Sequence, residues 1–250
     1  MNGLLAVERA PLPALRPYVT RLIAYREGVP VERIEYPFPG AVLVLGFEAP
    51  TEVNGMPYAS FGHGLGDRPA VTRVRAAAEG VEVMLTPFGA RRLYGAPMAA
   101  LTNLTVPVED LLGAWTSPLV ERLAETRSWE ERLRLTERFL LKRVMDGPEI
   151  GGQVPWAWGR LVASGGRVAV SDLARELGWS HRHLVARFHD AVGLAPKAAA
   201  RLIRFDRALA LLRGGMPPAE VAAACGYYDQ AHLNRDFRAF AGGPPGTLRS

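Results

Sequence analysis

The stretch PAEVAAACGYYDQAHLNRDF at residues 218–237 repeats the parts of SDLARELGWSHRHLVARF, at residues 171–188, in the same order. Each copy carries a small residue, a glycine, a leucine and a phenylalanine. A small alanine lets two helices cross closely, glycine adopts the left-handed turn, and leucine and phenylalanine bury the second helix. The two copies therefore predict two helix-turn-helix units. The matched residues are Ala174 and Ala222, Gly178 and Gly226, Leu184 and Leu233, and Phe188 and Phe237.

The spacing of these matches is not uniform. The alanines and the glycines lie 48 residues apart, whereas the leucines and the phenylalanines lie 49 apart, so the second turn is one residue longer. Between the copies, APKAAARLIRFDRALALLRGG (195–215) has apolar residues at helical spacing. A helix of about 19 residues is roughly 28 Å long. Since successive major-groove faces of DNA are roughly 34 Å apart, such a rod could hold two reading helices in adjacent grooves.

The charge of the chain is concentrated in the same half. The protein has 250 residues and a formal net charge of +5, with 13 Lys and Arg against 7 Asp and Glu in residues 155–250. That half has a net charge of +6 and residues 1–154 have −1, which favours a polyanionic partner for the C-terminal half. One cysteine, no long apolar stretch and no signal-peptide pattern predict a cytoplasmic protein that does not enter a membrane.

Composition also divides the chain. Glycine and proline interrupt DGPEIGGQVP (146–155), which predicts a linker at 148–154 between a domain at 1–147 and a domain at 155–250. Short β-like runs followed by two amphipathic helices within 107–145 predict a β-rich barrel with trailing helices. The fold class is therefore α+β, with an all-α second domain. The expected strands lie at 29–36, 41–47, 71–76 and 81–85.

The C-terminal half resembles the AraC/XylS family of bacterial transcription regulators. The likeness covers about 155–250 and is most specific in VAAACGYYDQAHLNRDFRAFAGGPPGTLR, residues 221–249. It implies that two helix-turn-helix units joined by a long helix bind double-stranded promoter DNA and usually activate transcription, with RNA polymerase as a partner. The N-terminal half resembles, more loosely, the cupin-like sensing domains of such regulators, in YPFPGAVLVLGF (36–47) and in residues 86–113.

The resemblance assigns DNA contacts to both reading helices. Arginine pairs with guanine, and glutamine or asparagine with adenine, whereas valine and alanine offer only contact with the thymine methyl. Arginines outside the reading positions are expected to bind phosphate, which fixes register without reading sequence. The expected base contacts are Ser180, His181, Arg182, Val185, Ala186, Gln230, Ala231, His232, Asn234 and Arg235, and the expected phosphate contacts are Arg187, Arg201, Arg204 and Arg238.

Three functions remain open for the N-terminal half. As a sensor, it could hold an anionic small-molecule effector through Arg91 and Arg92, if the turn expected at residues 87–89 aims them into the barrel mouth. As a spacer, it would bind no ligand and would form a homodimer through the helices in 107–145. A cupin enzyme is the least favoured, because a metal site needs several histidines and this half has only His63. We therefore expect no cofactor, no metal and no catalytic residue.

Overall fold

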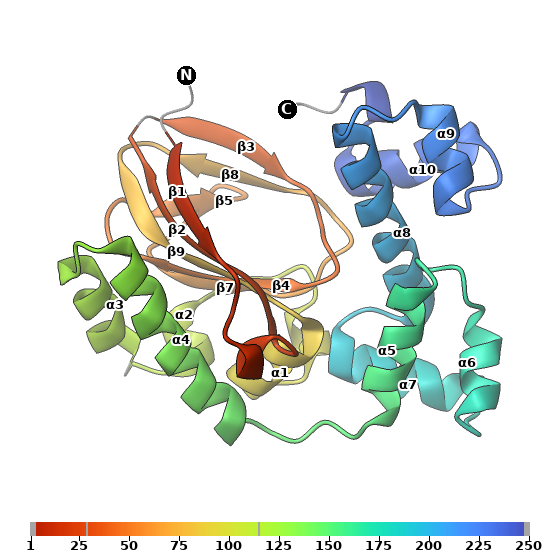
Figure 1. The fold of residues 1–250 in the computed structure, drawn as a ribbon, viewed down its shortest axis with the longest axis horizontal. Coiled ribbons are helices and arrows are strands. Elements are labelled where there is room, and N and C mark those ends of the chain that lie inside the picture. Colours follow the sequence, from red (N-terminus) through yellow and green to blue (C-terminus); the bar gives the residue numbers. More distant parts are fainter. Residues whose placement is uncertain (1–3, 29, 115, 248–250) are drawn as a thin grey trace.

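The computed structural model describes residues 4–28, 30–114 and 116–247. Its N-terminal part is rich in antiparallel β-structure and its C-terminal part is helical, so the predicted α+β class is confirmed. Figure 1 shows the two parts side by side, with the sheets packed against helices α1 to α4 and the long helix α8 running along the second part. Among the described residues, no helix combines the length and the apolar character that crossing a membrane requires.

The strands form two antiparallel sheets. The first has the order β1-β2-β9-β4-β7-β10 and the second the order β3-β8-β5-β6. Within the described residues no strand pairing joins the two sheets into a single closed barrel. The strands are β1 (Leu4–Arg9), β2 (Val19–Glu27), β3 (Val31–Glu35), β4 (Ala41–Gly46), β5 (Thr51–Val53), β6 (Met56–Tyr58), β7 (Phe61–His63), β8 (Ala70–Val74), β9 (Ala78–Leu85) and β10 (Thr105–Pro107).

The four predicted runs correspond to β3, β4, β8 and β9, except that Val29, the first residue of the run 29–36, lies outside the described residues. Alternation along β9 directs Val81 and Val83 to the face of the first sheet that the helices cover, where they are fully buried. Glu82, between them, lies on the opposite face, toward the second sheet. A small apolar cluster of Val44, Val53 and Phe61 fills part of the space between the sheets.

The helices of the N-terminal part cover the first sheet. The expected pair within 107–145 is found as three helices, because Gly113, at φ 91°, ends the first after five residues. Leu93, Leu133 and Leu140 are buried with the sheet in one core. The elements are the 3-10 helices η1 (Pro13–Leu15) and η2 (Met98–Leu101) and the helices α1 (Pro87–Tyr94), α2 (Val108–Leu112), α3 (Thr116–Glu125) and α4 (Trp129–Asp146).

The C-terminal part confirms both predicted helical hairpins and the long helix between them. Phe205 of α8 lies 4.8 Å from Phe237 and 5.1 Å from Phe240, measured between ring centroids, and all three are buried. The residues Gln153 and Val154 of the predicted linker belong to α5; the division into domains stays a prediction. The elements are α5 (Gln153–Ala163), α6 (Val170–Glu176), α7 (His181–Val192), α8 (Pro196–Arg213), α9 (Pro218–Cys225), α10 (Gln230–Ala241) and η3 (Pro245–Thr247).

Candidate DNA-binding surface

Helix α7 is the second helix of the first unit, and its N-terminal half lies on the surface. The Ser180 hydroxyl caps it by accepting a hydrogen bond from the His183 amide at 3.2 Å. Leu184 and Phe188 are fully buried and fix the helix on the core. The predicted contacts His181, Arg182 and Ala186 are exposed, and Val185 is half-buried.

Helix α10 repeats this arrangement in the second unit. The Asp229 carboxylate accepts a hydrogen bond from the His232 amide at 2.6 Å, and Leu233 and Phe237 are buried. Of the predicted contacts, Gln230, Ala231 and Arg235 are exposed, and His232 and Asn234 are half-buried. The ten predicted base contacts thus lie on α7 and α10 or at the cap of α7, and all ten side chains are exposed or half-buried. Their contact with DNA stays a prediction.

The repeat extends to two histidines that the sequence did not pair. His183 packs edge-on against Trp179, with ring centroids 4.6 Å apart, and His232 packs edge-on against Tyr227 at 5.1 Å. Each histidine is the third residue of its helix and donates its amide to the cap. The His232 Nδ1 also lies 3.5 Å from the Tyr228 amide nitrogen, where it accepts a hydrogen bond. In a neutral ring with this hydrogen bond, the proton is on Nε2.

The four arginines expected to bind phosphate fall into two pairs. Arg187 and Arg238 are exposed and, within the described part of the chain, make no ion pair. Arg201 instead donates to Asp236 Oδ1 from Nε at 3.1 Å and from Nη2 at 2.8 Å. Arg204 donates to the Gly166 carbonyl oxygen and lies over the Tyr227 ring. Phosphate binding by either pair remains untested, but Arg201 and Arg204 already have partners inside the domain.

The expected effector arginines lie on a helix. Thr86 caps α1 and Pro87 is its first residue, so the turn expected at 87–89 was wrong. Arg91 forms an ion pair with Asp190 of α7 at 3.1 Å and donates to the Asp190 carbonyl oxygen. Arg92 donates to carbonyl oxygens at the end of α4 and lies 5.6 Å from the centroid of the Tyr18 ring. Neither guanidinium is therefore free to hold a ligand without breaking these contacts.

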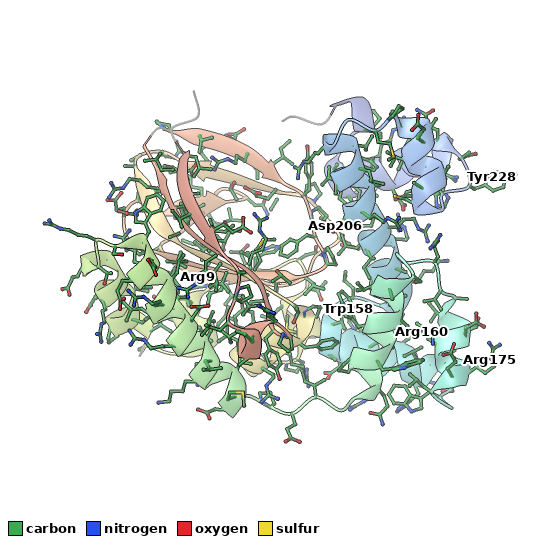
Figure 2. The ribbon with its side chains drawn as sticks, in the orientation of Figure 1. Arg9, Trp158, Arg160, Arg175, Asp206 and Tyr228 are labelled. Carbon is green, nitrogen blue, oxygen red and sulfur yellow. The ribbon has the colours of Figure 1, made fainter. Side chains whose placement is uncertain are left out.

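The Arg91 pair belongs to a seam between the two parts of the chain. Thr102, after η2, donates its hydroxyl to the carbonyl oxygen of Gly193, which ends α7 at φ 93°. The Trp158 ring of α5 (Figure 2) lies 6.3 Å from Phe88 of α1 and 6.2 Å from Phe188 of α7. These contacts engage the C-terminal end of α7 and leave its N-terminal half exposed. This seam could not be predicted from the sequence, because its partners lie far apart in the chain.

His63 and Glu82 are two titratable side chains of the N-terminal part. His63 Nδ1 lies 2.8 Å from the Thr105 hydroxyl, and burial lowers the pKa of the imidazole. The Glu82 side chain makes no hydrogen bond or ion pair with any described residue. Burial and the nearby Glu35 raise its pKa to about 7, against the opposing effect of Arg21 and Arg33.

Comparison with known proteins identifies the second part of the chain. Residues 173–250 match the family model of a helix-turn-helix domain. This part is an AraC-type helix-turn-helix domain. The chain aligns with an uncharacterized HTH-type transcriptional regulator, YbfI of Bacillus subtilis, at 35% identity over 66 residues, which are 26% of this chain and 24% of the relative. The chain thus spans about a quarter of that relative's length.

The likeness to solved structures extends beyond the AraC-type domain. A structure of ToxT from Vibrio cholerae aligns over 97% of this chain and 96% of the ToxT chain, with 10% sequence identity and a TM-score of 0.52. A second ToxT structure, bound to an unsaturated fatty acid, matches 98% of this chain and 95% of its own, with 12% identity and a TM-score of 0.50. At these identities the likeness is one of fold, and it includes the N-terminal sheets.

Proposed function

We propose that the protein is an AraC-type transcription regulator that binds promoter DNA and activates transcription. The observation that carries the proposal is the matched pair of exposed reading helices, α7 and α10, one in each hairpin beside α8. Eighteen residues of α8 span about 27 Å, a length suited to adjacent major-groove faces on one side of a duplex. RNA polymerase is the proposed partner on the promoter, and the cytoplasm the proposed compartment.

We further propose a division of labour among the exposed polar side chains. Arg182, Gln230 and Arg235 have the chemistry and the exposure for base edges, so they would read sequence. Arg187 and Arg238 would neutralise phosphates, which adds affinity for any duplex. Val185 and Ala186 would offer only methyl contacts, so α7 would read fewer bases than α10.

For the N-terminal domain we propose binding of a small effector between the two sheets. Arg91 and Arg92 are engaged elsewhere, whereas Glu82 on the inner face of β9 has no partner among the described residues. Helix α1 follows β9 directly and pairs with α7 through Arg91, so a change at β9 has a short path to the first reading helix. The fatty-acid-bound ToxT structure shows that one protein of this fold accepts a small ligand.

A spacer that forms a homodimer is the second candidate for this domain. Thermal unfolding of the full chain with a panel of metabolites separates the two candidates. A reproducible increase in the unfolding temperature with one ligand, lost in Glu82→Gln, supports the sensor. No ligand-dependent change, together with a dimer in native mass spectrometry, supports the spacer. We propose no reaction for this domain, because its sole histidine, His63, bonds to Thr105.

The DNA-binding proposal is tested by selecting preferred sequences from a random duplex library with the full chain. The selected duplex and a shuffled duplex of equal composition are then titrated at several salt concentrations. Specific regulators bind their sites typically 10³ to 10⁷ times more tightly than other sequences. Enrichment of one motif, with preferential binding to it, supports the proposal; equal competition by both duplexes overturns it.

A further inference from the structure

The two hairpins differ by one residue, and the structure identifies which residue is extra. The amide of Trp179 donates to the Ala174 carbonyl oxygen at 2.9 Å, and the amide of Tyr227 donates to the Ala222 carbonyl oxygen at 2.9 Å. Trp179 and Tyr227 are therefore equivalent, as their contacts with the two histidines also indicate. In the first hairpin the next residue, Ser180, is the N-cap of α7. In the second hairpin Tyr228 lies between Tyr227 and Asp229, the N-cap of α10.

The inserted residue is an exposed aromatic. Tyr228 is 94% exposed, the highest value among the large hydrophobic side chains of the described residues. Figure 2 shows its side chain projecting away from α9 and α10 into solvent. Residue 228 does not have a positive φ, so the backbone at this position places no demand on the type of side chain. The ring therefore contributes little to the fold and is available to a partner.

The surroundings of Tyr228 indicate which partner. It directly precedes the cap of α10, so it is continuous with the exposed Gln230 and Ala231 of the proposed reading surface. Its amide is directed at His232 Nδ1, which ties the position of this turn to a predicted base contact. Most protein–DNA hydrogen bonds go to phosphate and sugar, and tyrosine side chains and groups at helix N-termini are among the donors.

We propose that Tyr228 is a DNA-backbone contact of the second unit that has no counterpart in the first. The inference rests on the proposed DNA binding. The phenol hydroxyl donates to a phosphate oxygen and the ring covers the adjacent sugar. A neutral side chain displaces no counterion, so this contact strengthens binding to every sequence without changing the salt dependence. An arginine on phosphate, by contrast, contributes about 0.9 to the slope of log affinity against log salt.

The test compares Tyr228→Ala and Tyr228→Phe in the full chain, on the selected and the shuffled duplex at several salt concentrations. Loss of a neutral contact worth about 1–2 kcal/mol is a loss of roughly 5- to 30-fold. We expect Tyr228→Ala to lose affinity to that extent on both duplexes with an unchanged salt slope, and Tyr228→Phe to lose less. Met56→Ala removes a side chain that is 61% exposed on the N-terminal domain and should bind as the wild type does.

The outcomes separate this inference from the function on which it rests. Because the ring is exposed, both variants should unfold at the wild-type temperature, so weaker binding would not reflect misfolding. Wild-type affinity in Tyr228→Ala overturns the inference and leaves the DNA-binding proposal intact. A loss confined to the selected duplex, or lost activation with unchanged binding, also overturns it, in favour of a base contact or a protein contact. Failure of the wild type to prefer its selected duplex overturns both.

Discussion

Arg201 is the residue at which the sequence and the structure imply different roles. As a phosphate contact it would support DNA affinity; as the partner of Asp236 it supports the fold. Asp236 is 2% exposed, its Oδ1 accepts both Arg201 hydrogen bonds, and its Oδ2 has no partner among the described residues. Arg201→Ala would leave this buried carboxylate without its counter-charge.

The expected cost follows from this geometry. Removing one partner of a buried ion pair costs about 3–5 kcal/mol. The Arg201 side chain is 42% exposed, so water can partly replace the guanidinium, and we expect about 2 kcal/mol. For a chain of 250 residues, each kcal/mol lowers the unfolding temperature by about 2–4 °C, which predicts a decrease of about 4–8 °C.

The assay is thermal and denaturant unfolding of the full chain, with Arg207→Ala as the matched control. Arg207 is exposed on the same helix and has no ion pair among the described residues, so its removal changes the charge equally. We expect Arg207→Ala to unfold as the wild type does, and a change of Asp236 to Asn to recover part of the stability lost in Arg201→Ala. Unchanged stability of Arg201→Ala, with a salt slope lower by about 0.9, would refute the structural role.

Three further predictions concern the reading surface and the N-terminal domain. Arg235→Ala should relax base preference at one position of the selected site, by about 1–3 kcal/mol of discrimination, in binding to single-base variants; uniform weakening would contradict this. Arg238→Ala should weaken binding to all duplexes and lower the salt slope by about 0.9, and an unchanged slope would remove it from the phosphate contacts. The pKa of Glu82 is raised to about 7 in the folded protein, so the protonated side chain favours the folded state. This contribution to stability is complete below about pH 4.5 and is lost as pH rises through 7. Glu82→Gln should therefore exceed the wild type in stability at pH 8 by about 1–3 kcal/mol and show no advantage at pH 4, measured by urea unfolding.

The helical half could be predicted from sequence because its signals are local. Gly178, Gly226 and the apolar residues around them are close in the chain, and both hairpins were found where the repeat predicted them. Capping signals were present for α1 as well, in Thr86, Pro87 and Gly95, but the Pro-Phe-Gly stretch was interpreted as a turn.

The sheets were harder to predict because their pairings are long-range. Strands β5, β6, β7 and β10 have three residues each, too few to show alternation. Their order also depends on pairings such as that of β10 with β7, about 40 residues apart. The partners of the arginines could not be predicted for the same reason. Asp236 lies 35 residues from Arg201 in the chain, and Asp190 lies 99 residues from Arg91.

The spacing of the two contacts on DNA tests the central claim most directly. If α7 and α10 read adjacent major grooves from the two hairpins beside α8, hydroxyl-radical footprinting of the selected duplex should show two protected blocks about 10–10.5 base pairs apart on one face. Protection at the second block should decrease in Arg235→Ala while the first block persists. A single protected block, or two blocks on opposite faces of the duplex, would contradict the account.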